Sequence, residues 1–286
     1  MTRRAPSAAA IAALLLCLSS CASVPAPPAS PPVAIGAQLY TVRESMARDP
    51  DATLRAVGAM GYDEVEFAGL FGKSPEHFRA LLAELHLRPV ASHIDWQQFR
   101  DHPEVAIDET RRLGAPWLVL AWLPPEQRAS LAQWRGWIAR LNAVGAMARA
   151  KGLRLAYHAH DFEYRPIAGV RPIDLLQKGL DPALVDFEID VYWTRRGGGD
   201  PMALFRRFPG RFPLAHFKDM TPGGAMADIG DGTIDYAAIL AAAPRSGLRH
   251  AIVERDDGSD PMNTLRVGLA RLRAIEARQA VSAPRP

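Results

Sequence analysis

The 286-residue chain has little cysteine and little lysine. Its two cysteines, Cys17 and Cys21, lie near the N-terminus, so the rest of the chain offers no disulfide, thiolate zinc site or cysteine nucleophile. Lysine supplies only four of the 34 basic residues, and 31 acidic residues nearly balance the total. Without the arginines at positions 3 and 4 the balance is 32 against 31, which gives no electrostatic case for a nucleic-acid partner.

Long apolar runs are also missing. The longest, over residues 8–18, is shorter than the roughly 20 residues of a transmembrane helix, and it follows two arginines as in a signal peptide or an uncleaved anchor. The next residues, Leu18-Ser19-Ser20-Cys21, resemble the lipobox of bacterial lipoproteins. This resemblance implies a signal peptide over residues 1–20, lipidation of Cys21 and export to the periplasm. Alanine at position 22, rather than aspartate, implies the outer membrane.

Proline is concentrated directly after the predicted lipidation site. Five prolines in residues 22–33 are typical of a semi-rigid tether, which extends about 3.1 Å per residue. We therefore expect a tether over 21–34, a folded domain over 35–276 and a disordered tail over 277–286. Contact with the membrane is expected through the N-terminal lipid only.

From residue 35 onward, short apolar runs alternate with amphipathic stretches. The pattern predicts strands at 35–41, 62–68, 88–94, 117–123, 154–160, 185–192, 212–219 and 250–256. It predicts helices near 50–60, 75–86, 103–113, 129–151, 172–179, 200–208, 235–243 and 260–276. Eight strand–helix units without a glycine-rich nucleotide turn after the first strand favour a single (β/α)₈ TIM barrel over a doubly wound sheet.

Polar residues recur at every second position of the predicted strands, which is the period of side chains facing a barrel interior. The expected interior side chains are Gln38, Tyr40, Glu64, Glu66, His93, His158, His160, Asp186, Glu188, Asp190, His216, Lys218, Glu254 and Asp256. Buried carboxylates need partners, and a divalent ion with mixed carboxylate and imidazole ligands would supply one. The set suits Mn, Mg, Co or Zn. A network of ion pairs involving Arg154 or Lys218 is the alternative.

Six short stretches together resemble the xylose isomerase-like family of sugar phosphate isomerases and epimerases. They are Ile35–Arg43, Tyr157–Tyr164, Asp190–Trp193, His216–Asp219, Gly230–Asp235 and Val253–Asp256. The resemblance implies a TIM barrel that holds one divalent metal near the carboxyl ends of its strands. Three of the family's four ligands carry over onto Asp190, His216 and Glu254. The fourth carries over onto Glu163, with His158 and His160 as competitors.

The resemblance also implies the chemistry. The metal polarises a carbonyl, a side chain removes the neighbouring C–H proton, and the resulting enediolate is protonated elsewhere or expels a β-substituent. We expect His158, His160, Glu163 and Lys218 to act in catalysis, although Lys218 has an ion pair with Glu188 or Asp256 as an alternative role. Substrate contacts are expected from Gln38, Tyr40, Glu66, His93 and Trp193, with core packing as the alternative for His93 and Trp193.

These inferences predict a metal-dependent isomerase or epimerase of an unphosphorylated sugar or keto-sugar outside the cytoplasm. A lyase or hydratase of 3-keto-glycosides is the alternative in the same class. A non-catalytic sugar-binding lipoprotein is less favoured, because binding alone does not require a metal triad. An abasic-site nuclease would need a denser ligand cluster and a basic face, and the sequence indicates neither.

Overall fold

A computed structural model describes residue 2 and residues 32–282 of the chain. The predicted signal peptide, the lipidation site Cys21 and nearly all of the tether lie outside the described residues, so these remain predictions. Within the described part, no helix has the length and apolar character needed to cross a membrane.

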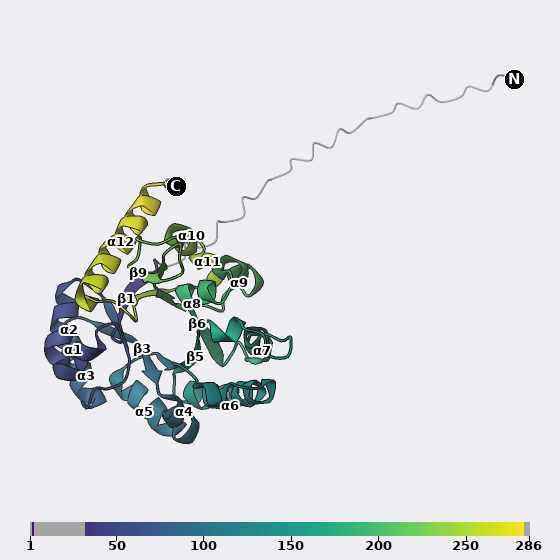
Figure 1. Cartoon of the computed structure of the whole chain (residues 1–286), viewed down its shortest axis with the longest axis horizontal. Coiled ribbons are helices and arrows are strands. Elements are labelled where there is room, and N and C mark those ends of the chain that lie inside the picture. Colours follow the sequence, from purple (N-terminus) through teal and green to yellow (C-terminus); the bar gives the residue numbers. More distant parts are fainter. Residues whose placement is uncertain (1, 3–31, 283–286) are drawn as a thin grey trace. The chain divides into compact units, whose positions relative to one another are not determined.

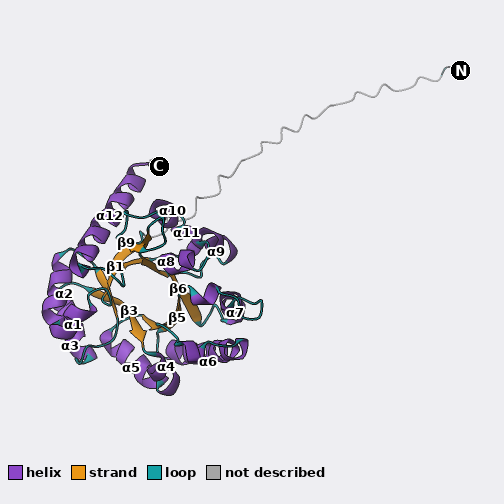
Figure 2. Ribbon diagram, in the orientation of Figure 1, coloured by secondary structure: helices purple, strands orange, loops and turns teal. Residues whose placement is uncertain are grey.

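Eight parallel strands close into a barrel in chain order, which confirms the predicted TIM barrel. Figure 2 shows the strands as an inner ring with the helices outside it. The barrel strands are β1 (Ala34–Gln38), β2 (Glu64–Phe67), β3 (Arg88–Ile94), β4 (Trp117–Leu120), β5 (Arg154–Ala159), β6 (Val185–Asp190), β7 (Leu214–Phe217) and β10 (His250–Val253). A small hairpin, β8 (Asp219–Met220) and β9 (Met226–Ala227), follows β7.

The helices surround the strands, as Figure 1 shows. The eight predicted ones are α2 (Pro50–Ala59), α3 (Pro75–Glu84), α5 (Pro103–Leu113), α6 (Leu131–Ala150), α7 (Pro172–Gly179), α9 (Pro201–Arg207), α10 (Tyr236–Ala241) and α12 (Pro261–Ser282). Short additional helices are α1 (Arg43–Arg48), α4 (Trp96–Asp101), α8 (Val191–Arg196), α11 (Ala243–Ser246), and the 3₁₀ turns η1 (Pro125–Gln127) and η2 (Phe162–Tyr164).

Local chemistry explains where the helices begin and end. Asp49 and Ser74 accept hydrogen bonds from backbone N–H groups of the first turns of α2 and α3, and proline occupies the next position in both. At the other end of α5, Gly114 has φ 92°, a left-handed conformation that glycine adopts without steric cost. These signals were readable in the sequence.

Several predicted boundaries differ from the structure by a few residues, and two of the differences have a clear local cause. The strand predicted over 185–192 ends at Asp190, because the Asp190 carboxylate accepts a hydrogen bond from Trp193 N and starts α8 there. The tail predicted as disordered from residue 277 is helical as far as Ser282. Its alanine, arginine and glutamine residues favour helix, so α12 continues beyond its last apolar contact with the barrel.

The barrel interior is layered. Glu64 and Asp186 lie at the amino ends of the strands. Above them is a buried apolar layer of Val90, Ala91, Trp117, Val119, Ala156, Leu214 and Ile252. Trp117 lies within this layer, and its indole N–H donates to Asp186. The polar side chains of the candidate site follow at the carboxyl ends.

Candidate metal centre

Three predicted metal ligands meet at the carboxyl end of three neighbouring strands. Asp190 ends β6, His216 lies in β7 and Glu254 follows β10, and these strands are adjacent in the barrel. Asp190 is directly opposite His216 in the strand register. One ligand atom from each of the three residues lies within 4.8 Å of the other two. All three side chains are buried, so the barrel geometry forms the triad without help from a long loop.

The ammonium group of Lys218 lies among these carboxylates. Its Nζ is 2.9 Å from Asp190 Oδ2 and 3.0 Å from Asp256 Oδ1, and it also forms an ion pair with Glu254. Burial opposes its charge, but the three carboxylates raise the pKa of Lys218 well above its ordinary value. Of the alternative ion pairs considered from the sequence, the one with Asp256 is present.

The triad residues fit a divalent cation. Two carboxylates and one imidazole are ligands that Zn²⁺, Mn²⁺ and Co²⁺ accept. Without a cation, burial raises the pKa of Asp190 to about 6, although Lys218 lowers it. A bound divalent ion would offset the cost of burying the Asp190 carboxylate, as the ammonium group of Lys218 does in part.

Glu163, the fourth predicted ligand, does not join the triad. It lies in η2 and is fully buried. Its Oε1 accepts a hydrogen bond from Tyr157 Oη at 2.6 Å, and its Oε2 accepts one from His160 N at 2.9 Å. Burial raises the pKa of Glu163 to about 7 despite these bonds. The turn after β5 thus folds Glu163 back on its own strand, so the expected ligand role is not supported.

His158, the first competitor for that role, faces two groups of residues. Its Nε2 is 3.9 Å from Asp190 Oδ2 in the triad, whereas its Nδ1 is 3.0 Å from Glu188 Oε2 below the triad. Burial, together with the neighbouring His216, lowers the pKa of His158 to about 3. The ring is therefore neutral and has a lone pair available for a metal.

Glu188 is a central residue that sequence reasoning placed in the interior without assigning it a role. Its Oε2 is 2.7 Å from His93 Nε2 and 3.3 Å from His216 Nε2, in addition to its approach to His158. Burial opposes a charge on His93, but Glu66 and Glu188 beside it raise its pKa to about 10. The alternation along the strand that placed Asp190 in the barrel interior also placed Glu188 there.

Two residues predicted to bind substrate, Gln38 and Glu66, lie beneath His216, and a third, Tyr40, is exposed after the end of β1. Glu66 is fully buried, and its Oε2 accepts hydrogen bonds from His216 Nε2 at 2.6 Å and from Gln38 Nε2 at 2.9 Å. Gln38 is likewise buried and accepts a hydrogen bond from Tyr40 N. Glu66 and Gln38 therefore support His216 from below rather than facing substrate. Tyr40 is 43% exposed, with the guanidinium of Arg43 4.4 Å from its ring centre.

An aromatic wall lies after β5 and β6. The His160 ring stacks on Phe162 at 5.2 Å and lies 5.8 Å from Trp193, whose ring centre is 5.9 Å from Lys218 Nζ. Burial and the neighbouring His158 lower the pKa of His160 well below its ordinary value, so its ring is neutral. His160 Nδ1 and Trp193 Nε1 are buried without hydrogen-bond partners. The predicted residues His160, Lys218 and Trp193 are thus brought together beside the triad.

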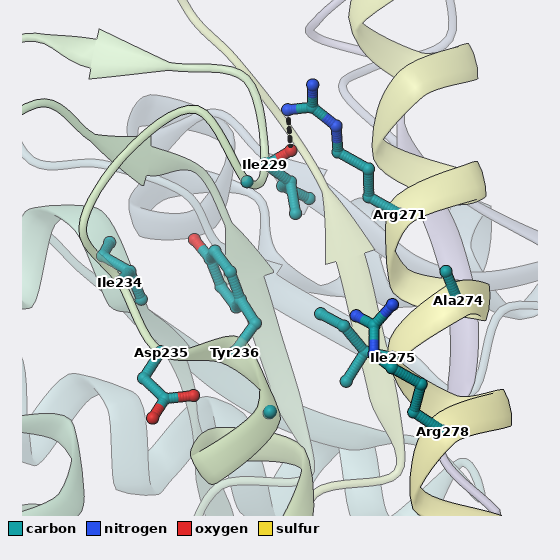
Figure 3. Close-up of a pocket in the computed structure, with 10 residues that line it drawn as sticks. Ile229, Ile234, Asp235, Tyr236, Arg271, Ala274, Ile275 and Arg278 are labelled. Carbon is teal, nitrogen blue, oxygen red and sulfur yellow. Dashed lines mark hydrogen bonds between the residues drawn. The ribbon is translucent and has the colours of Figure 1, made fainter.

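A separate cavity of about 340 Å³ lies between α10 and α12, on the outer side of the strands. Figure 3 shows Tyr236 and Ile234 facing Ile275 and Arg271 across it, with Arg271 donating to the carbonyl of Ile229. None of the triad residues lines this cavity. Its connection to the site is the hydrogen bond from Tyr236 Oη to the carbonyl of Lys218. Tyr236 therefore fixes the backbone behind the ammonium group.

Fold and site together define the class of the protein. A sequence profile described as the xylose isomerase-like TIM barrel matches residues 54–275. The chain belongs to this family.

Eight curated relatives, all named inosose dehydratase, resemble the chain at low identity. The one from Geobacillus kaustophilus is 24% identical over 235 residues, which cover 67% of this chain and 74% of the relative. The one from Lacticaseibacillus casei is 26% identical over 164 residues, 51% of this chain and 54% of the relative. The chain thus spans about half the length of several of these relatives.

Solved structures share the fold. A sugar phosphate isomerase/epimerase from Parabacteroides distasonis superposes with a TM-score of 0.73 at 22% identity, over 88% of this chain and 99% of that one. A structure described as IolI protein with a bound zinc atom gives a TM-score of 0.66 at 16% identity, over 86% and 99% of the two chains. At these identities the likeness establishes the fold alone.

Proposed function

We propose that this chain is a metal-dependent lyase that removes water from a polyhydroxylated ring ketone. The observation that carries the proposal is a neutral histidine, His160, whose buried Nδ1 has no hydrogen-bond partner and which lies beside a charged lysine and a metal-ligand triad. The relatives named inosose dehydratase support a lyase or hydratase, which was the alternative considered from the sequence, over an isomerase or epimerase. Their names also support an inosose as the substrate class, and a 3-keto-glycoside remains the substrate of the alternative considered from the sequence.

Asp190, His216 and Glu254 would hold the ion. Three protein ligands leave positions open for substrate, which is the usual difference between a catalytic and a structural site. When bound, the ion polarises the substrate carbonyl and so acidifies the adjacent C–H bond. Metal analysis of the purified protein would decide among Mn, Mg, Co and Zn.

The chain's own residues would move the protons. His160 accepts the proton from the carbon next to the carbonyl, because its ring is neutral and its Nδ1 has no hydrogen-bond partner. Lys218 donates hydrogen bonds to the oxygen that gains negative charge and so stabilises it. The β-hydroxyl takes up the proton that His160 removed and leaves as water, while the carbonyl re-forms beside the new C=C bond. Trp193 covers one face of the ring. Glu163 holds the turn that carries His160.

Incubation of the metal-loaded protein with inososes and with 3-keto-glycosides in deuterated water tests this proposal. We expect a product lighter than the substrate by one molecule of water or one aglycone, with an α,β-unsaturated ketone absorbing in the ultraviolet. A product of unchanged mass that carries deuterium would instead support the isomerase or epimerase expected from the sequence. No reaction with either substrate class would contradict the proposed substrate.

We also propose that the chain is a lipoprotein anchored through Cys21 to the outer membrane, facing the periplasm. The support is the lipobox-like sequence alone. Cys21→Ser should abolish acylation and release the protein from the membrane fraction. Unchanged membrane association of that variant would refute the anchor.

A further inference from the structure

The group of residues below the triad contains buried ligand atoms that form no hydrogen bond. His93, His158, Glu188 and His216 each offer one ligand atom, and these atoms lie within 4.8 Å of one another. Glu188 Oε1, His158 Nδ1 and the neighbouring Glu66 Oε1 are buried without a hydrogen-bond partner. Buried polar atoms without partners are rare in native proteins, and a bound ion is one established cause.

The carboxylates of this group also lack a cationic partner of permanent charge. Among the described residues, Glu66 and Glu188 form ion pairs only with histidines. Lys218 instead pairs with Asp190, Glu254 and Asp256 in the layer above. A divalent ion in the lower group would balance two carboxylates at once.

We propose that the barrel holds a second divalent cation in this lower group, bound by His93 Nε2, His158 Nδ1, Glu188 and Glu66 Oε1. Glu188 Oε2 lies 2.7 Å from His93 Nε2 and 3.0 Å from His158 Nδ1, and Glu66 Oε1 lies 3.3 Å from His93 Nε2. Ligands about 2.0 Å from a tetrahedral ion are about 3.3 Å apart, so small side-chain movements suffice. Two imidazoles and two carboxylates favour Zn²⁺ or Co²⁺ over Mg²⁺.

The lower site differs from the triad in being closed. All four ligands come from the chain, and Glu66 and Glu188 are fully buried, which is typical of a structural rather than a catalytic ion. Glu66 connects the two sites, because its Oε2 accepts the hydrogen bond from His216 Nε2. A lower ion that fixes Glu66 would therefore also fix the ring of the triad histidine.

The test is metal stoichiometry of the full chain, stripped with a chelator and reloaded with zinc alone. We expect two ions per chain in the wild type. His93→Ala and the near-isosteric Glu66→Gln should each retain one ion, and Glu254→Gln should retain the other. With cobalt in place of zinc, the intense visible absorption of a tetrahedral site should disappear in His93→Ala and persist in Glu254→Gln.

Each result decides the question. One ion in the wild type that persists in both His93→Ala and Glu66→Gln would overturn the lower site and leave imidazolium–carboxylate pairs as the explanation. Two ions in all three proteins would also overturn it. One ion that is lost in His93→Ala but kept in Glu254→Gln would support the lower site and contradict the triad, so the two proposals fail separately. If His93→Ala does not fold, Glu66→Gln supplies the same comparison.

Discussion

Both ends of the barrel interior carry buried carboxylates, but the hydrogen-bond partners of these carboxylates differ between the two ends. At the amino end, Asp186 accepts two hydrogen bonds from Arg154, at 2.5 and 2.7 Å, and a third from Trp117. Glu64 pairs with His250 at 2.8 Å. Each of these carboxylates has its partners within the protein.

At the carboxyl end, the carboxylates outnumber their partners. Glu66 Oε1 and Glu188 Oε1 are buried without hydrogen bonds, and one lysine is shared by three acids. Satisfied buried carboxylates contribute to stability, whereas unsatisfied ones cost stability and persist where a ligand completes them. We therefore expect the amino end to determine stability and the carboxyl end to determine activity.

The sharpest comparison lies within one strand, because Asp186 and Asp190 both belong to β6 and both face the barrel interior. Asp190→Asn should lower kcat/KM by about 10⁴-fold, since a lost metal ligand removes several kcal/mol of transition-state stabilisation. Its melting temperature should stay close to that of the wild type. Asp186→Asn is the matched control and should keep its kcat/KM. Equal activity losses in the two variants would remove the distinction between the ends.

His160 tests the proton transfer separately from metal binding. His160→Ala should lower kcat by about 10³-fold, within the range for a general base, while metal content is unchanged. The exposed His102, at the start of α5, supplies a control substitution without effect on kcat. A His160→Ala variant that exchanges the substrate proton at the wild-type rate would assign the base elsewhere.

Most of the barrel could be predicted because its signals are local. Alternation of period two identified all eight strands, and Asp–Pro or Ser–Pro pairs marked helix starts. The alternation along the strands and the family resemblance together predicted Asp190, His216 and Glu254. Each lies on or directly after a strand, and a closed barrel brings the strand ends together. Short helices such as α8 were missed, since a single cap by Asp190 ends the strand.

Glu163 could not be predicted in the same way. It lies beyond the end of β5, so its position depends on the turn and not on strand parity. The hydrogen bond from Tyr157 Oη to Glu163 attaches the expected metal ligand to the strand that precedes it. No periodic pattern encodes that contact. Glu66 and Gln38 were placed in the interior correctly, but whether they lie above or below the ligands depends on barrel stagger.

Glu163 belongs to neither end and gives a pH-dependent prediction. Its pKa is raised by burial to about 7 in the folded chain, so the folded state binds an extra proton between about pH 4.5 and 7. The free energy of unfolding should therefore fall by up to about 3 kcal/mol as the pH rises through this range, and no further above it. Glu163→Gln should lack this component in chemical denaturation at pH 5, 6, 7 and 8. Parallel curves for the two proteins would show that Glu163 is ionised throughout.

The smallest expected effect concerns the amino end. Asp186→Asn removes the charge from the pair with Arg154, whose side chain is 48% exposed, so solvent screening limits the loss. Hydrogen bonds to a charged group contribute about 2 kcal/mol, which corresponds to a decrease of about 4–8 °C in melting temperature for a domain of this size. Glu76→Gln is the control, because Glu76 makes the same two-bond contact with Arg112 on the surface. Its melting temperature should be nearly unchanged. If both variants lost equal stability, burial of Asp186 would contribute nothing, and the amino end would differ from the surface only in position.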